Sequence, residues 1–312
     1  MTRVLITGGC GFVGSNLAPI LLREGHEVVI YDNFSRGSKF YLDDVGKYSI
    51  INGDIRDKSS LLSAFENVEV IIHLAAYGSV VESVKNPIEN YSINAEGTFN
   101  VLNAAREAGV KKFIFASTGG ALIGNSLAAV NEQSVPRPIS PYGASKLAGE
   151  GYCCAFANSY DMSITALRFA NVVGPISWHK KGVITNFFKA IIENKPLQIF
   201  GDGKATRDFL YVQDLCEGLL SALTKIKVGY NVYHLASGKE YSIKEIADLA
   251  CNVSGSNYSK VIYHPTRKGE VERNCGDFRL AQKQIGFKPQ VPIDEAMKRT
   301  WEWFKSFSTL KK

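Results

Sequence analysis

Short runs of apolar residues alternate with longer segments of helical periodicity in the first half of the chain. The apolar runs lie at residues 4–6, 26–31, 48–51, 68–74, 112–117 and 163–169, and the helical segments lie at 15–22, 58–65, 90–107 and 141–160. This alternation is typical of a parallel sheet whose helices cover both faces. We therefore predict a Rossmann-type, doubly wound α/β domain over residues 1–172.

The pattern changes after residue 172. A loop and a predicted helix at 184–193 are followed by shorter elements. Two further apolar segments, near 209–223 and 232–236, predict that the chain returns to the first domain. Residues 173–312 are expected to form mainly a smaller, discontinuous α/β lobe that binds the substrate.

Three glycines between the first apolar run and the first helical segment indicate a phosphate-binding turn. At positions 8, 11 and 14 they would let the backbone turn tightly, approach a pyrophosphate closely and pack helix against strand. The second apolar run stops at Asp32, 18 residues after Gly14. In dinucleotide-binding folds an acid at the tip of this strand binds the adenosine ribose hydroxyls, and it would repel a 2′-phosphate. The spacing therefore predicts NAD rather than NADP as the cofactor.

The composition is that of an ordinary globular protein and restricts the classes of partner. The 312 residues carry a formal net charge of +6, and the lysines and arginines are scattered along the chain. This distribution favours anionic small molecules over nucleic acid. No apolar run reaches the roughly 18 residues of a membrane span, and the first strand leaves no room for a signal peptide. We therefore expect a cytoplasmic protein without a membrane segment.

The cysteines and histidines indicate no metal site. None of the six cysteines falls in a CxxC spacing, and the five histidines are far apart and form no i, i+4 pair. We expect reduced thiols and no bound metal.

A tyrosine and a lysine four residues apart, Tyr142 and Lys146, suggest acid–base chemistry. On a helix this spacing places both side chains on one face. A phenol normally titrates near pH 10, so a tyrosine acts as a base at neutral pH only beside positive charge. The lysine and a bound NAD would supply that charge, which makes Tyr142 a candidate general base.

Taken together, the motifs resemble those of the extended short-chain dehydrogenases/reductases, within the branch of nucleotide-sugar epimerases and dehydratases. The resemblance covers essentially the whole chain. It rests on the segments 7–14, 32–33, 53–55, 73–76, 94–98, 142–146, 171–175 and 201–209. Within this branch the chain is most similar to the UDP-glucose (UDP-galactose) 4-epimerases.

The resemblance implies a role for each matching residue. The implied catalytic residues are Thr118, Tyr142 and Lys146. The residues implied to bind NAD are Gly8, Gly11, Phe12, Val13, Gly14, Asp32, Asn33, Asp54, Ile55, Leu74, Ala75, Ala76, Ser117, Tyr142 and Lys146. The residues implied to bind the substrate are Ser79, Thr118, Asn171, Arg207 and Arg267, of which the last three would hold its diphosphate. A homodimer joined by the helices near 90–107 and 141–160 is also implied.

The implied reaction is NAD-dependent epimerisation at C4 of a UDP-sugar of the UDP-glucose/UDP-galactose type. Tyr142 would remove the proton of the C4 hydroxyl while the C4 hydride passes to NAD. The resulting 4-keto sugar would turn over and receive the hydride on its other face. The family usually has a tyrosine shortly after Thr118 where this chain has Ile123, which leaves the sugar specificity open.

Other uses of the same oxidised sugar remain alternatives. A 4,6-dehydratase adds an acid pair directly after the catalytic threonine, whereas this chain has Gly119-Gly120, which argues against dehydration. A UDP-glucuronate 4-epimerase or a decarboxylase needs a site for a carboxylate, which Ser79, Ser83 and Lys85 could form. A non-catalytic regulator that binds NAD or a nucleotide sugar is a further alternative, although it would have no need of the Tyr-Lys pair.

Overall fold

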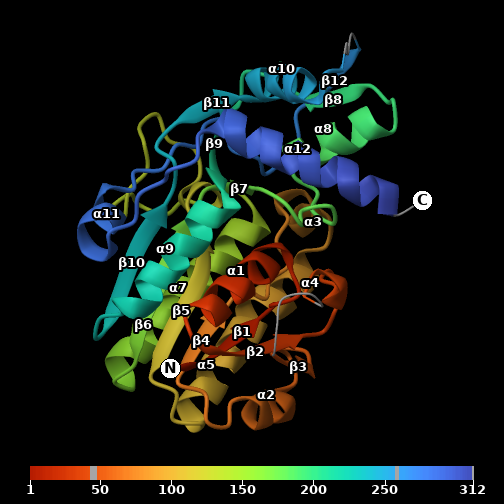
Figure 1. Ribbon diagram of the computed structural model, residues 1–312. Coiled ribbons are helices and arrows are strands. Elements are labelled where there is room, and N and C mark those ends of the chain that lie inside the picture. Colours follow the sequence, from red (N-terminus) through yellow and green to blue (C-terminus); the bar gives the residue numbers. More distant parts are fainter. Residues whose placement is uncertain (43–47, 257–259, 311–312) are drawn as a thin grey trace.

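A seven-stranded parallel sheet forms the centre of the molecule in the computed structural model, which describes residues 1–42, 48–256 and 260–310 (Figure 1). The strands follow one another across the sheet in the order β10-β6-β5-β4-β1-β2-β3, and each neighbouring pair is parallel. Their bounds are β1 (Arg3–Thr7), β2 (Glu27–Asp32), β3 (Ser49–Asn52), β4 (Val70–His73), β5 (Lys112–Thr118), β6 (Ser163–Phe169) and β10 (Tyr230–Leu235). The predicted doubly wound α/β fold is thereby confirmed.

Strand β1 lies in the interior of the sheet because its residues are apolar on both faces. Leu5 is paired with Val29 on one side and with Ile71 on the other, and all three side chains belong to one layer of the core. Val4 and Ile6 belong to the opposite layer. The chain extends the sheet through β2 on one side of β1 and through β4 on the other. A crevice for ligands is expected at such a reversal, beyond the carboxyl ends of the strands.

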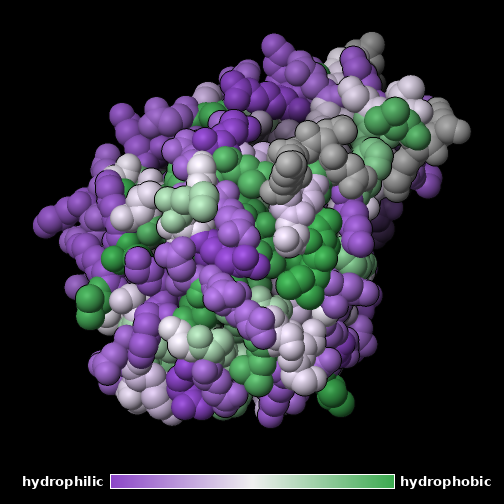
Figure 2. Space-filling model, turned by 60° about the horizontal axis from the view of Figure 1, so that its bottom comes forward, coloured by the Kyte–Doolittle hydropathy of each residue, from purple (hydrophilic) through white to green (hydrophobic). Residues whose placement is uncertain are grey.

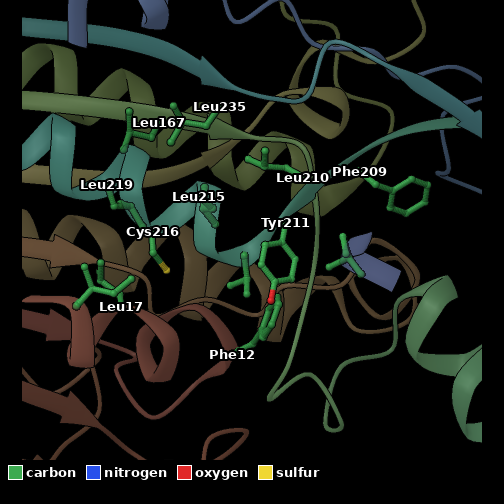
Figure 3. Packing of buried hydrophobic residues seen from close by; sticks show 14 of the residues in the cluster. Phe12, Leu17, Leu167, Phe209, Leu210, Tyr211, Leu215, Cys216, Leu219 and Leu235 are labelled. Atoms are coloured by element: carbon green, nitrogen blue, oxygen red, sulfur yellow. The ribbon is translucent and has the colours of Figure 1, made fainter. Parts of the chain in front are cut away.

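Helices cover both faces of the sheet. On one face lie α1 (Phe12–Arg23) and α9 (Val212–Thr224), which contact each other. Figure 3 shows how Leu17 of α1 and Leu215 and Leu219 of α9 pack in this layer of the core. On the opposite face lie α2 (Lys58–Ala64), α5 (Gly97–Glu107) and α7 (Pro141–Ser159).

A second lobe lies at one end of the large sheet (Figure 1). It contains a three-stranded sheet of order β11-β9-β7 and a two-stranded sheet of β12 and β8, with three helices around them. The bounds are β7 (Asn171–Val173), α8 (Val183–Ile192), β8 (Leu197–Phe200), β9 (Thr206–Tyr211), β11 (Glu240–Ser242), α10 (Ile243–Ser254), β12 (Val261–His264) and α12 (Ile293–Leu310). Between these elements the chain returns to the large sheet through α9 and β10.

The predicted helix at 90–107 is different in the structure. Helix α4 (Pro87–Tyr91) begins earlier, and a π-helical turn, η2 (Ser92–Glu96), separates it from α5. Within this turn Asn94 accepts a hydrogen bond from the N–H of Tyr77 and donates to α7 through its amide. Hydrophobic periodicity carries no signal for such a turn, because the side-chain contacts that accompany it are made by residues distant in sequence.

The expectation that only shorter elements follow residue 193 is wrong for two helices, because α10 has 12 residues and α12 has 18. Four short elements outside the second lobe are also absent from the hydrophobic pattern. They are η1 (Lys39–Tyr41), α3 (Val80–Lys85), α6 (Gly120–Ile123) and α11 (Arg279–Ile285).

On the face that Figure 2 shows, hydrophilic residues predominate and the hydrophobic ones form separate groups. Among the described residues, no helix combines the length and the apolar character that crossing a membrane requires.

Candidate cofactor and catalytic site

One cavity of about 630 Å³ lies between the large sheet and the second lobe. It extends from the glycine turn after β1 to Asn171 on β7, Arg207 on β9 and Arg267 after β12. Every residue predicted above to be catalytic, cofactor-binding or substrate-binding lines it. The fold therefore brings together side chains from segments that are far apart in the sequence.

Two positions of the glycine turn accept no side chain. Gly8 has a φ of +69°, and a Cβ atom there would lie 2.7 Å from backbone atoms of Ala75. A Cβ atom on Gly14 would lie 2.5 Å from the backbone of Gly9. Gly11 precedes α1 and offers no side-chain acceptor, so the first N–H groups of the helix stay available to an anion. This cradle fits the pyrophosphate of a dinucleotide.

Two carboxylates shape the wall of the cavity next to this turn. Asp32 accepts hydrogen bonds from the N–H groups of Cys10 at 2.9 Å and Phe34 at 2.7 Å, while burial raises its pKa. Asp54 forms an ion pair with Arg56, and the hydrogen bonds from that guanidinium hold the pKa of Asp54 well below its usual range. The protein's own contacts therefore hold both carboxylates in position.

Helix α7 carries Tyr142 and Lys146 to the cavity. Ser140 caps the helix, because its side chain accepts a hydrogen bond from the N–H of Gly143. The N–H of Tyr142 donates to Ser83 Oγ of α3 at 3.1 Å. The first turn of α7 is thus fixed by its own cap and by a buried hydroxyl from a separate helix.

The ammonium group of Lys146 does not hydrogen-bond to the phenol. Its Nζ donates to the carbonyl of Ala116 at 2.7 Å and lies 4.8 Å from the centroid of the Phe115 ring. Burial lowers the pKa of Lys146 to about 8 and raises the pKa of Tyr142 to about 12. Among these contacts burial sets the direction of the Tyr142 pKa, and no hydrogen bond joins Lys146 to the phenol.

A buried ion pair holds β5 where Thr118 ends the strand at the cavity. Ser117 Oγ donates to Glu150 Oε1 of α7 at 2.5 Å. Arg168 of β6 binds the same carboxylate through two hydrogen bonds of 2.9 and 2.8 Å, and both charged side chains are only 6% exposed. Breaking such a pair leaves an uncompensated buried charge. The pair therefore fixes β5, β6 and α7 relative to one another behind the catalytic candidates.

Two arginines line the part of the cavity that the second lobe forms. Arg207 Nη1 donates to the carbonyl of Thr206 at 2.8 Å, and burial lowers its pKa. The Arg267 guanidinium lies 3.4 Å from the centroid of the Phe200 ring and 3.7 Å from a carboxylate oxygen of Glu270. Within the described residues no ion pair includes Arg207, which leaves its charge available to an anion in the cavity.

Ile123, which stands where the family usually has a tyrosine, does not line the cavity. It is 4% exposed and belongs to a small apolar cluster of its own. In the same segment Ala121 lines the cavity, and the side chain of Asn274 packs so closely on Gly120 that a Cβ atom there would lie 2.2 Å from its amide nitrogen. The cavity wall after Thr118 is therefore built from small residues and an amide.

Sequence patterns miss several polar residues of the cavity. Arg36 lies over the ring of Tyr77 at 4.3 Å and pairs with Glu82, which also pairs with Lys181. Lys180 and Asn274 line the cavity as well. Lys181 lines the cavity too, and adjacency in the sequence alone does not indicate which of the two lysines pairs with a carboxylate.

The glycine cradle, the uncapped start of α1 and Asp32 fit a dinucleotide in the position that the sheet topology predicts. Thr118, Tyr142 and Lys146 line the same cavity. Fold and site together define a Rossmann-type, dinucleotide-binding protein with a Thr-Tyr-Lys group at its cofactor site.

Comparison with known proteins narrows this class. The sequence model of the NAD dependent epimerase/dehydratase family matches residues 4–236. The chain is 35% identical to the UDP-glucose 4-epimerase of Mycolicibacterium smegmatis over 314 residues, which cover 98% of this chain and 99% of that protein. It is 32% identical to the UDP-glucuronate 4-epimerase of Thermodesulfobacterium geofontis over 316 residues, 98% of this chain and 97% of that protein.

A solved structure agrees in both fold and cofactor. The Thermus thermophilus UDP-glucose 4-epimerase in complex with NAD superposes with a TM-score of 0.92 at 32% identity, covering 97% of this chain and 99% of that one. The chain therefore belongs to the NAD dependent epimerase/dehydratase family, and NAD is its cofactor. The predicted family resemblance is confirmed. The relatives differ in the sugar that their names give, at nearly equal identity, so identity alone does not select the sugar.

Proposed function

We propose that this protein catalyses NAD-dependent epimerisation at C4 of a UDP-sugar of the UDP-glucose/UDP-galactose type. In this proposal, residues 1–172 and the returns near 209–236 bind NAD, and residues 173–312 mainly bind the nucleotide sugar. The observation that carries the proposal is the single cavity that joins the glycine cradle, the Thr-Tyr-Lys group and the arginines of the second lobe.

The proposed roles follow from the chemistry of each side chain. Tyr142 removes the proton of the C4 hydroxyl as a general base, a role that typically contributes about 10²- to 10⁴-fold in rate. Thr118 hydrogen-bonds to the sugar hydroxyl, and Lys146 holds the cofactor ribose. Asn171, Arg207 and Arg267 hold the diphosphate, for which the planar guanidinium fork is well suited.

The cofactor completes the site in this proposal. When bound, NAD supplies an oxidised nicotinamide ring that takes up and returns a hydride and that places positive charge near the phenol. Because burial raises the pKa of Tyr142 to about 12, the phenol needs added positive charge to act as a base near neutral pH. Lys146, with a pKa lowered to about 8, is charged at neutral pH and contributes part of it.

The segment after Thr118 favours epimerisation over 4,6-dehydration. Dehydratases of this branch carry an acid pair at the two positions that Gly119 and Gly120 occupy here. A Cβ atom on Gly120 would lie 2.2 Å from the Asn274 amide, and one on Gly119 would lie 3.1 Å from the His234 ring. This chain therefore lacks the acids, and a side chain at position 120 would have to displace the Asn274 amide.

A UDP-glucuronate 4-epimerase is the second candidate because of the relative that carries that name. Of the three residues that could form a carboxylate site in this alternative, only Ser79 lines the cavity. Ser83 is buried, and its hydroxyl donates to the carbonyl of Val80 while accepting from the N–H of Tyr142. Lys85 is exposed and outside the described cavity lining. We therefore favour a neutral hexose.

The test is to incubate the purified protein and NAD separately with UDP-glucose, UDP-N-acetylglucosamine and UDP-glucuronate, and to identify products by chromatography and NMR. We expect UDP-galactose from UDP-glucose and no product with the Tyr142→Phe variant, whose NAD and UDP affinities are measured to show that it remains folded. Turnover of UDP-glucuronate alone would favour the second candidate. A dehydrated or decarboxylated product, or no turnover despite NAD binding, would contradict epimerisation.

We also propose a homodimer. On α4 the apolar side chains Ile88 and Tyr91 are more than half exposed, and Tyr152 of the adjacent α7 is partly exposed. Cys153 and Phe156, by contrast, are buried in the core. Light scattering should give twice the chain mass of 34.3 kDa. Ile88→Glu should lower it to the monomer mass, whereas Leu127→Glu, at another exposed apolar residue, should not.

For the location we propose the cytoplasm. All six cysteines of the chain are free thiols, which is the state that a reducing compartment maintains. Cell fractionation with an antibody against the chain tests this proposal, and recovery outside the cytoplasmic fraction would contradict it.

A further inference from the structure

A lysine that the predicted roles do not include lies in the cavity. Lys180 belongs to the loop between β7 and α8 and lines the cavity. Its Nζ donates to the carbonyl of Val172 at 3.0 Å and lies 4.3 Å from the centroid of the Phe12 ring. The ammonium group is thus held between the start of α1 and the strand that carries Asn171.

Lys180 differs from its charged neighbours in having no carboxylate partner among the described residues. Arg36 and Lys181 both pair with Glu82, and Arg267 pairs with Glu270. The ammonium group of Lys180 has three N–H donors, and the carbonyl of Val172 accepts a hydrogen bond from one of them. The side chain is half-buried, and an anion in the cavity would compensate its charge.

The loop that presents Lys180 is strained and tightly held. Ile176, a β-branched residue, has a φ of +65°, in the left-handed region that such residues rarely adopt. Ser177 Oγ donates to the carbonyl of Gly174 at 2.7 Å, and the N–H of Lys180 donates to the carbonyl of Ser177 at 3.0 Å. Strain of this kind persists where surrounding contacts enforce it and is common at ligand sites.

The two contacts of Lys180 identify the class of ligand. Phe12 opens α1, whose uncapped N–H groups attract an anion, and Val172 follows Asn171 on β7. Phe12 and Tyr211 of the second lobe belong to one buried cluster, part of which Figure 3 shows. We propose that Lys180 is a binding residue for a diphosphate ester, contributed either by the dinucleotide cofactor or by the nucleotide sugar. The second source rests on the proposed function.

The experiment measures the dissociation constants of UDP and of NAD separately, by calorimetry, for the wild type and Lys180→Met. A charge-assisted hydrogen bond to phosphate predicts that the variant binds one of the two ligands at least about tenfold more weakly. The ligand that loses affinity identifies the source. Lys189→Met is the matched control, because Lys189 also lies over an aromatic ring, Trp178 at 5.2 Å, but outside the described cavity lining.

A pH measurement separates anion binding from a purely structural role. Burial lowers the pKa of Lys180 to about 8, so above that pH a bound diphosphate must draw a proton back onto the amine. Calorimetry just above pH 8, in buffers of different ionisation enthalpy, should therefore show proton uptake by the wild type that Lys180→Met lacks. His179 stays neutral there with a pKa of about 4, and burial also keeps Tyr211 neutral. Lys146 titrates in the same range and is common to both proteins.

Equal affinities of the wild type and Lys180→Met for both ligands would overturn the proposal. Thermal unfolding shows that the variant is folded, and Lys180→Gln provides a second uncharged variant should Met aggregate. Lys180→Arg should retain most of the affinity. These outcomes do not depend on which sugar is epimerised, because UDP and NAD binding are measured without turnover. A protein that turns over no sugar but loses affinity on Lys180→Met would contradict the proposed function and support this inference.

Discussion

The two sides of the cavity satisfy their charges in opposite ways. On the cofactor side, Asp32 accepts two backbone N–H groups and Asp54 is paired with Arg56. On the second-lobe side, Arg207 and Lys180 have no ion pair within the described residues, and burial lowers the pKa of both. The two carboxylates of the first wall are thus held by protein contacts before a ligand arrives. On the second wall the half-buried charges of Arg207 and Lys180 lack a protein anion within the described residues, so a bound nucleotide should stabilise it.

The largest effect is expected from a substitution in the closely packed glycine turn on the cofactor side of the cavity. Gly8→Ala places a methyl group 2.7 Å from the Ala75 backbone at a φ of +69°. Left-handed backbone alone costs an ordinary residue about 1–2 kcal/mol, and the steric overlap adds to this. We expect the affinity for NAD to fall by at least about 100-fold in a calorimetric titration.

The control for this variant is Gly25→Ala. Gly25 has a similar φ of +80°, but a Cβ atom there has nothing within 4 Å. It should lower the midpoint of thermal unfolding slightly and leave NAD affinity unchanged. If both variants lose NAD affinity equally, strain rather than the close approach at Gly8 explains the loss, and the cradle is not pre-formed as we describe.

The contrast between the two sides also explains how much could be predicted from sequence. The cradle is local: Gly8 and Gly14 lie within one strand-turn-helix unit, and Asp32 ends the next strand, so spacing alone locates them. The second lobe contributes side chains from separate elements, and pattern does not tell that Lys180 contacts Phe12 and Val172 while Lys181 pairs with Glu82. Those assignments depend on tertiary packing.

The residues that we propose as catalytic are an intermediate case: sequence locates them but does not give their pKa values. The Tyr-Lys spacing and the family resemblance locate the side chains, and the helix places both at the cavity. The direction of the phenol's pKa could not be predicted in this way, because burial raises it and the lysine donates to Ala116 instead. The π turn at Asn94 is not predictable from the pattern either, since its partner Tyr77 is distant in sequence.

The next largest effect is expected when the charge of Arg207 on the second-lobe side of the cavity is removed. Arg207→Met should weaken UDP binding by about 10- to 100-fold, the range expected for charge-assisted hydrogen bonds, and leave NAD affinity unchanged. The midpoint of thermal unfolding without ligand should not fall, because the variant removes a desolvated charge that has no ion pair within the described part of the chain. Arg273→Met, which removes an arginine paired with Glu240 outside the described cavity lining, serves as the control for UDP binding. Loss of NAD binding by Arg207→Met would contradict the assignment of this arginine to the side of the cavity that binds UDP.

The smallest effect is on stability as a function of pH. Burial lowers the pKa values of Lys146 and Lys180 to about 8, whereas the unfolded chain holds these protons up to about 10.5. At these two positions the unfolded state therefore binds more protons between pH 8 and 10, so the two lysines contribute a rise of the free energy of unfolding with pH there. Buried thiols and phenols such as Cys216 and Tyr142 contribute in the opposite sense, because they keep protons that the unfolded chain releases. The lysine contribution is therefore the difference between the wild type and a variant without the two ammonium groups.

Denaturant titrations at several pH values, without nucleotide, measure this dependence. Between pH 8 and 10 the free energy of unfolding of the wild type should rise relative to that of the double variant Lys146→Met/Lys180→Met. An equal pH dependence of the two proteins would show that the two ammonium groups are compensated in the absence of a ligand, against the comparison drawn here.

The central claim is that the hydride removed from C4 of the sugar stays on the enzyme and returns to the same carbon. The most direct measurement is to equilibrate UDP-glucose with the protein and NAD in D₂O and to examine position 4 of the products by NMR. Our account predicts UDP-galactose that carries protium at C4, because the hydride leaves and returns to the same carbon without exchange with solvent. Deuterium at C4 would show that the epimerisation proceeds by proton removal from carbon and would contradict the account.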